Sequence, residues 1–280
     1  MFGPTPGRAA TIAALLAIVT LGATLRMVPR WRGADPDLIS DAAFHLRMTR
    51  AVAERGRTPA VDSLASAPAG RTVEDLLPTG FYQAAGGFHR LAAAIDRRDV
   101  DAHARVFVAL AGALVAFPVY GAARALHPGR APALAAALVA VILPAHLHRS
   151  FDYWFRYESL GALLIATQVA LSLRALSASS PRTLRTAAVG AALALVGALA
   201  VWRVAFMIPV LEACFVAAYA LLRPPGAALR AWWTAQAVAG TLACLGLGYL
   251  RHQSFVSSTP WLLAIALALA LWTPWLRREG

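Results

Sequence analysis

Acidic side chains with arginine neighbours occur at two places in the sequence, each beside a long apolar run. The first place is Asp41, with Asp35 and Asp37 shortly before it. The second place is segment 146–158, whose ionisable residues are His146, His148, Arg149, Asp152, Arg156 and Glu158. Ionisable groups at a membrane boundary are costly unless they are paired or hydrated, so such groups indicate a functional site.

The chemistry that these residue types favour is phosphate chemistry. Carboxylates from two loops can hold a hard divalent cation, Mg²⁺ or Mn²⁺, which prefers oxygen ligands. Such a cation neutralises a pyrophosphate leaving group, and arginines can bind phosphate oxygens in bidentate fashion. This hypothesis requires that the surrounding helices bring the two places to the same side of a membrane.

The composition excludes a water-soluble enzyme and a disordered chain. Of the 280 residues, 59% are hydrophobic and 14% are charged, whereas a soluble domain carries about a quarter charged residues. The net charge of +12 does not indicate nucleic-acid binding, because residues 29–102 hold ten Arg and ten acids and are neutral. The remaining arginines lie mostly at the ends of apolar runs, as membrane anchors do. We therefore expect membrane lipid as a partner and no nucleic acid.

The apolar runs predict an all-α, polytopic membrane fold, since a bilayer core needs about 20 apolar residues per helix. There are about eight transmembrane helices by this criterion. The runs are Ala9–Val28, Val106–Leu126, Ala131–Leu147, Leu160–Leu176, Ala187–Val201, Val204–Leu222, Ala231–Leu250 and Trp261–Leu276. The expected organisation is a first helix in residues 1–28, a long outer loop in 29–102 and a bundle of about seven helices in 103–280.

The arginines of the short loops predict the orientation. With the N-terminus in the cytoplasm, the inside segments hold ten Arg and the short outside loops hold four, which agrees with the positive-inside rule. We read the first run as a retained helix, because only Arg8 precedes it and it shows no clear cleavage site. The sequence thus predicts an integral protein of the plasma (inner) membrane with both termini cytoplasmic and the two acidic places outside.

The long loop contains two predicted helices. Segment 41–57 has helical spacing of apolar residues, with Ser40 as a cap and Gly56 as its end. Segment 81–95 is the second helix, which we expect to be interrupted at Gly86 and Gly87.

The first acidic place resembles a motif of oligosaccharyltransferase catalytic subunits, which are membrane glycosyltransferases of the GT-C type. Asp41 is followed by an aromatic residue, a His, Arg47 and a short helix that ends at Gly56, as in the first outer loop of that family. Further parts of the chain are similar to other segments of the family: 68–71, 142–158 and Trp202 with Arg203. The resemblance covers roughly residues 10–220 and implies a GT-C-like fold.

The resemblance implies roles for the acidic residues, and the sequence differs from the family's pattern at one position. Asp41 takes the role of a metal ligand, and Glu158 matches the second acid of the family's acid-x-acid motif. Arg156 stands where the first acid is expected. Three alternatives follow: Asp152 supplies the missing carboxylate, Arg156 replaces the charge of the cation, or the catalytic centre is lost. The expected metal ligands are Asp41, Asp152 and Glu158, and the expected phosphate-binding residues are Arg47, Arg149 and Arg156.

Each assignment also has a structural alternative. Asp41 and Arg47 could form a helix cap with a surface ion pair, and Glu158 could serve as a structural bridge to Arg149 or Arg156. Glu212 is the acid that lies deep in an apolar run, which is the sole motive for considering a transporter. The family's later helices, second outer loop and soluble domain have no counterpart in these 280 residues. The chain is therefore interpreted as a short member, one half of a split enzyme or a fragment.

The leading hypothesis is a membrane glycosyltransferase. By resemblance, it would move a sugar or glycan from a polyprenyl (pyro)phosphate donor to an acceptor on the extracytoplasmic face, with Mg²⁺ or Mn²⁺ as cofactor. The alternative is a non-catalytic or split-enzyme subunit that binds the lipid-linked sugar and needs a second chain for the chemistry.

Overall fold

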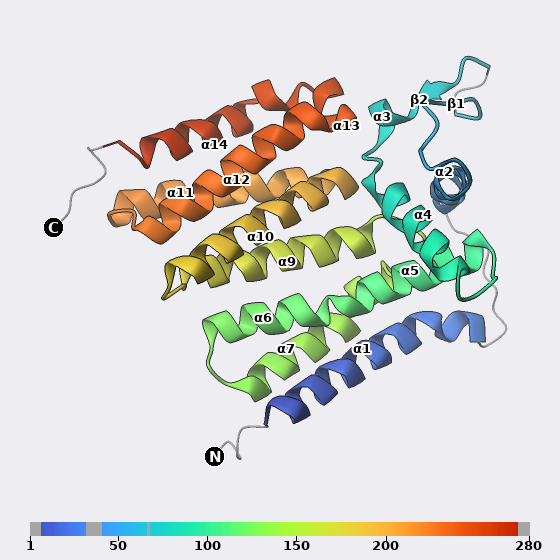
Figure 1. The fold of residues 1–280 in the computed structure, drawn as a ribbon, viewed down its shortest axis with the longest axis horizontal. Helices are drawn as coiled ribbons and strands as arrows, with labels where there is room; N and C mark the ends of the chain where they lie inside the picture. Colours follow the sequence, from blue (N-terminus) through green and yellow to red (C-terminus); the bar gives the residue numbers. More distant parts are fainter. Residues whose placement is uncertain (1–6, 32–40, 66–67, 274–280) are drawn as a thin grey trace.

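The structure, a computed structural model, describes residues 7–31, 41–65 and 68–273 and is predominantly helical (Figure 1). Asp35, Asp37 and Ser40 lie outside the described residues. Within these described ranges, five segments are long and apolar enough to cross a membrane. They are Arg8–Pro29 within α1 (Arg8–Trp31), Val100–Leu126 across α5 (Val100–Leu114) and α6 (Ala116–Leu126), α9 (Glu158–Leu176), α10 (Pro181–Val201), and Arg203–Leu222 across η1 (Arg203–Phe206) and α11 (Met207–Leu222).

The remaining apolar runs form shorter or more polar helices, so the expected number of eight spans is not confirmed. The run at 131–147 divides at Pro144 into α7 (Arg130–Ile142) and α8 (Pro144–His148), since the residue before a proline avoids the helical conformation. The last described helix, α14 (Thr259–Ala270), is also short. Between α11 and α14 lie α12 (Ala227–Gly246), α13 (Gly248–His252) and η2 (Phe255–Ser257).

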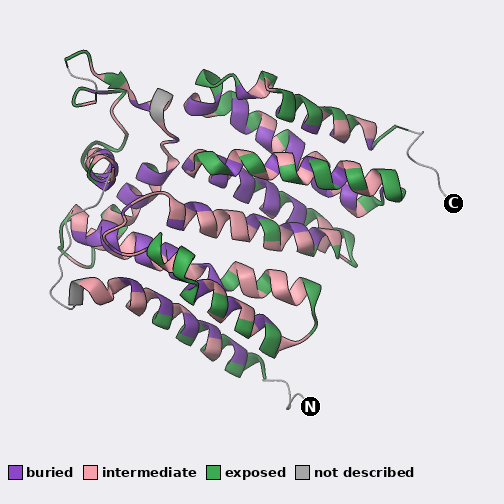
Figure 2. Ribbon diagram, turned by 180° about the vertical axis from the view of Figure 1, so that it is seen from behind, coloured by how far each residue is buried: buried purple, intermediate pink, exposed green. Residues whose placement is uncertain are grey.

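The outer faces of the long helices are apolar, as a bilayer requires. Exposed large side chains on α11 and α14 include Leu211, Phe215, Leu221, Leu263 and Leu269. Figure 2 shows exposed residues running along the outward sides of the helices, while buried residues face the neighbouring helices. Exposed apolar surface of this extent indicates contact with lipid. The structure thus supports an integral membrane protein.

The segment between the first two spans folds into a small layer at one end of the bundle. It consists of α2 (Ala42–Arg55), β1 (Val61–Asp62), β2 (Arg71–Thr72), α3 (Val73–Leu76) and α4 (Gly80–Ala93). The strands pair antiparallel, with Val61 opposite Thr72. The first residues of α1 and the last of α14 lie at the opposite end of the bundle (Figure 1).

The two predicted helices of this layer are present, with one correction. Gly56 ends α2 as expected, because it adopts a left-handed conformation with φ of 83° and its N–H donates to the Val52 carbonyl. Gly86 and Gly87 do not interrupt α4. A side chain on Gly86 would place Cβ 2.6 Å from Cγ1 of Val52, so this glycine lets α4 approach α2 closely. The interruption predicted from two adjacent glycines is wrong, because packing outweighs the helix propensity of these residues.

The layer shares a hydrophobic core with the bundle. Buried side chains of α2, α4 and α5 pack with Phe155 and with Val201 at the end of α10. A second set of contacts connects α1 to the segment before α9. They are made by Arg26, which is completely buried. Its guanidinium donates to Ser150 Oγ at 2.8 Å and to the Val141 carbonyl at 3.2 Å, and its carbonyl accepts from the backbone N–H of Asp152 at 3.3 Å. These contacts fix where segment 149–157 leaves the bundle.

Candidate functional site

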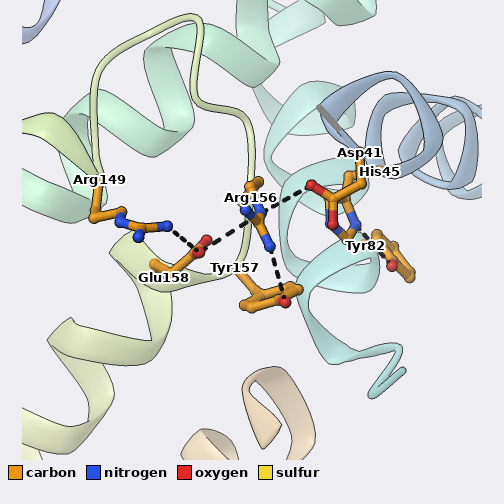
Figure 3. Close-up of polar contacts among 7 residues, drawn as sticks. All are labelled: Asp41, His45, Tyr82, Arg149, Arg156, Tyr157 and Glu158. Carbon is orange, nitrogen blue, oxygen red and sulfur yellow. Dashed lines mark hydrogen bonds and ion pairs between the residues drawn. The ribbon is translucent and has the colours of Figure 1, made fainter. Parts of the chain in front are cut away.

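Asp41 lies directly before α2, at the junction between the layer and the bundle. Its side chain makes no capping hydrogen bond with the helix. Instead, its Oδ1 atom lies 3.0 Å from Nε of Arg156 (Figure 3). Arg47, the proposed surface partner of Asp41, pairs with Asp62 of β1. The structural alternative of a helix cap with an Arg47 ion pair is therefore not what the structure shows.

Arg156 lies between the two acids that the sequence singled out. Its Nε atom is also 3.6 Å from Oε1 of Glu158, and its Nη2 donates to the Tyr157 hydroxyl at 3.3 Å. The guanidinium carbon lies 5.3 Å from the ring centre of Trp154 and 5.5 Å from that of Tyr157. Cation–π contacts of this kind add to the ion pairs. The guanidinium is therefore held by two carboxylates, a hydroxyl and two aromatic rings.

Glu158 is the first residue of α9, and this position favours a negative side chain because the helix N-terminus carries partial positive charge. Its carboxylate pairs with Arg149 at 3.6 Å as well as with Arg156. The side chain of Glu158 is 12% exposed, whereas that of Arg149 is 53% exposed. Arg149 therefore retains access to a ligand that Glu158 alone would not reach.

The Trp154 ring contacts both arginines of the site. The guanidinium carbon of Arg149 is 5.1 Å from its ring centre, close to the value for Arg156. The structure shows that Trp154 positions both cations of the site.

A buried histidine and a tyrosine position Asp41 from the other side. His45, one turn into α2, is completely buried, with its Nε2 atom 3.4 Å from Oδ2 of Asp41 and its Nδ1 atom 2.9 Å from the Tyr82 hydroxyl. Because a carboxylate only accepts hydrogen bonds, the Nε2–H group of His45 faces Asp41, and Nδ1 shares a hydrogen bond with the Tyr82 hydroxyl. Sequence reasoning missed Tyr82, which lies on α4 and carries no pattern that links it to Asp41.

The electrostatics of this chain keep Asp41 ionised. The polar contact with His45, together with the charges of His45 and Arg156, lowers the pKa of Asp41. Burial raises the pKa of Tyr82, so its hydroxyl keeps its proton. The site therefore presents a charged carboxylate whose orientation is fixed by α2 and α4.

Asp152 and Arg47 make contacts with α1 and β1, respectively. Asp152 is completely buried and its backbone N–H bonds to α1. Arg47 lies against β1 and over the Phe44 ring, with its guanidinium carbon 5.5 Å from the ring centre. Their assignments as metal ligand and phosphate-binding residue stay predictions.

The residues of the site do not fit a divalent cation in this arrangement. Mg²⁺ needs octahedral oxygen ligands at about 2.0–2.1 Å, but Asp41 and Glu158 both direct an oxygen at the Arg156 guanidinium. Among residues 7–31, 41–65 and 68–273, no three His, Cys, Asp or Glu side chains are grouped so that they could hold a metal ion. With Arg149 included, two negative and two positive side chains meet and their formal charges cancel.

Comparison with known proteins places the fold. No protein-family model and no curated protein sequence matches the chain. The structure is similar to the oligosaccharyltransferase of Archaeoglobus fulgidus in its apo form, with a TM-score of 0.76 over 97% of this chain and 33% of that chain, at 16% identity. The complex of that enzyme with zinc and sulfate gives 0.74 over 95% and 35% of the two chains, also at 16% identity.

A third similar structure is the archaeal oligosaccharyltransferase AglB from Archaeoglobus fulgidus with an inhibitory peptide and a dolichol-phosphate. Its TM-score is 0.74 at 16% identity, and it covers 96% of this chain and 33% of that chain. This chain thus spans about a third of the length of the structures it matches. The resemblance inferred from the motifs is confirmed at the level of fold, and it corresponds to one part of the larger enzymes.

Proposed function

We propose that this protein binds a polyprenyl (pyro)phosphate-linked sugar at the site of Asp41, Arg149, Arg156 and Glu158 and transfers the sugar on the extracytoplasmic face. One observation carries the proposal. Two acidic residues that are 117 positions apart in the chain share the guanidinium of Arg156, and Arg149 pairs with the second acid beside it. The site lies where the α2–α4 layer meets the start of α9, a helix long and apolar enough to cross a membrane, and we propose that a lipid phosphate binds at this level.

The phosphate would be bound by the two arginines. Guanidinium groups match phosphate oxygens in bidentate geometry, and Arg149 is sufficiently exposed to reach a ligand first. In the transfer, the bond between the anomeric carbon and the phosphate oxygen breaks and its electron pair stays on the phosphate. Arg149 and Arg156 would stabilise that charge as it develops.

The carboxylates would act on the acceptor. As the acceptor atom bonds to the anomeric carbon it loses a proton, which Asp41 or Glu158 can take within hydrogen-bond reach. Asp41 suits this role because it is ionised and oriented by His45 and Tyr82. The structure that contains a dolichol-phosphate and a peptide belongs to the archaeal enzyme, and we extend the lipid-linked donor to this chain as part of the proposal.

Binding and transfer can be tested separately. The full chain in lipid nanodiscs would be titrated with dolichyl phosphate, comparing the Arg149→Gln/Arg156→Gln variant with Arg98→Gln. Arg98 also pairs with an acid, Asp96, but lies outside the site. We expect at least about a tenfold loss of affinity in the double variant and none in the control. Equal affinity in all three proteins would contradict the phosphate assignment.

Transfer itself is tested by incubation with a polyprenyl diphosphate-linked sugar and by measuring the release of polyprenyl diphosphate by mass spectrometry. We expect Asp41→Asn to abolish release while it retains dolichyl phosphate binding. Unchanged turnover in Asp41→Asn would remove Asp41 from the mechanism.

A second candidate function is a subunit that binds the lipid-linked sugar without completing the chemistry. It is favoured by the position of Arg156, which pairs with both acids of the site. A second chain would then supply the remaining groups. Donor binding without release, followed by release after co-expression with a second chain, would support this candidate over the first.

A further inference from the structure

The geometry points to a phosphate site that excludes a divalent metal, because the Arg156 guanidinium occupies the position between Asp41 and Glu158 that a bridging cation would need. This inference deepens the proposed function, since it concerns how the same site binds its phosphate. It names an internal arginine as the permanent counter-charge of both carboxylates.

The distances show why the Arg156 guanidinium and a divalent metal ion cannot occupy the site together. A single atom, Nε of Arg156, lies 3.0 Å from an oxygen of Asp41 and 3.6 Å from an oxygen of Glu158. A metal ion with both oxygens at about 2.0–2.1 Å would lie where the guanidinium now is, or within contact of it. Two like charges at that separation repel strongly in a partly desolvated site. Arg156 would therefore have to leave before a metal could enter.

The surroundings of Arg156 oppose its departure. Its side chain is 17% exposed, and Trp154 and Tyr157 contact its guanidinium. The Tyr157 hydroxyl accepts a further hydrogen bond from Nη2. An arginine cannot be neutralised by proton loss, so the positive charge persists at every pH at which the protein is folded.

The charges also favour phosphate over metal. The two acids are balanced by Arg149 and Arg156, so a divalent cation would meet a site that is already neutral. An anionic phosphate, in contrast, can draw the exposed Arg149 away from Glu158 and use both guanidinium groups. Glu158 would keep Arg156 as its partner in that state.

The decisive measurement is Mn²⁺ binding by electron paramagnetic resonance on the full chain in nanodiscs of neutral lipid. We expect the wild-type protein to bind no more Mn²⁺ than Asp41→Asn does. Arg156→Asp replaces the guanidinium by a third carboxylate next to Asp41 and Glu158, and we expect it to bind Mn²⁺ at least about tenfold more tightly than wild type. Arg98→Gln removes an arginine from an acid elsewhere and should match wild type.

Each outcome bears on the inference. Saturable Mn²⁺ binding by the wild-type protein that is lost in Asp41→Asn would overturn it, as would an Arg156→Asp protein that gains no site. If Arg156→Asp does not fold, the comparison of wild type with Asp41→Asn decides alone. Dolichyl phosphate binding, measured once in EDTA and once with added Mn²⁺, tests this inference separately from the proposed function. Retained binding supports both, binding that requires Mn²⁺ contradicts the inference alone, and no binding under either condition contradicts the proposed function.

Discussion

At the scale of single residues, Arg156 has a different role from its neighbour Arg149 although both pair with Glu158. Arg156 is largely buried and contacts two acids and two rings, whereas Arg149 is more than half exposed. Exposed ion pairs contribute about 0–1 kcal/mol to stability. Removal of the partner of a partly buried charge lowers the stability by more than this, because the remaining charge is left without an opposite charge beside it.

This difference predicts unequal effects on stability. Arg156→Gln leaves Asp41 and Glu158 near each other without the charge between them, so we expect it to lower the free energy of unfolding by about 1–3 kcal/mol. For Arg149→Gln we expect a change below about 1 kcal/mol. Thermal unfolding in detergent, followed by circular dichroism, measures both. A larger loss in Arg149→Gln would contradict the structural account of Arg156.

The hydroxyl of Tyr82 gives a second residue-level prediction. Tyr82→Phe keeps the ring in the aromatic cluster around His45 but removes the hydrogen bond to Nδ1. We expect a loss of about 1 kcal/mol in stability and a lower rate of sugar release, because His45 no longer holds Asp41 in one orientation. Phe44→Leu changes a neighbouring ring without touching a hydrogen bond and serves as the control. An unchanged rate in Tyr82→Phe would assign the hydroxyl a structural role alone.

The pKa of Asp41 yields a prediction with a definite sign. Because its folded-state pKa lies below the usual value of about 3.9 for Asp, the carboxylate adds stability that is complete above that value and is lost as the pH falls through the lower folded-state value. The difference in melting temperature between the wild type and Asp41→Asn should therefore be constant from pH 8 to about pH 5 and shrink below about pH 4. A difference that shrinks already between pH 7 and pH 6 would refute the lowered pKa.

At the scale of helices, much was predictable from the sequence. Apolar runs and helical spacing located the membrane helices and α2, and Gly56 marked the end of α2 correctly. What the sequence could not give was the contact between α4 and α2, because the partner of a glycine lies in another element. The same reason explains why Tyr82 was missed.

The two adjacent glycines of α4 offer a matched test of this contact. A Cβ on Gly86 would lie 2.6 Å from Val52 Cγ1, whereas a Cβ on Gly87 would meet nothing within 4 Å. We expect Gly86→Ala to destabilise the protein by about 1–3 kcal/mol through overpacking. Gly87→Ala should stabilise α4 by about 0.5–1 kcal/mol, because alanine favours helix. Equal effects of the two substitutions on the melting temperature would contradict the close packing of α4 on α2.

At the scale of the whole molecule, the sequence predicted the fold class and the meeting of the two acidic places. The expected number of eight long apolar helices is not confirmed: within the described residues, Pro144 divides one run and the last helix is short. The expected metal rested on the carboxylates and on the family resemblance, and the sequence left open that Arg156 replaces the charge of the cation. The position of Arg156 between Asp41 and Glu158 could not be read from the sequence.

The orientation of the whole molecule is open to a direct test. We expect the α2–α4 layer outside and the turn between α9 and α10 inside. In a variant without Cys214 and Cys244, a cysteine at Arg57 should react with a membrane-impermeant maleimide in intact cells, and a cysteine at Ser179 only after permeabilisation. Both positions are exposed, so accessibility to water alone does not separate them. The reverse labelling pattern would place the site in the cytoplasm.

The buried contacts of Arg26 have a consequence for how the protein can be produced. Arg26 joins the first helix to Ser150 and Asp152, at the base of the segment that carries Arg156. A shortened product that begins at Met27, or a fusion that removes the first helix as if it were a secretion signal, would keep every residue of the site. It would nevertheless lose the hydrogen bonds of Arg26 that hold segment 149–157 against the bundle. Inactivity of such a preparation would therefore reflect the loss of these contacts and not the loss of a catalytic group.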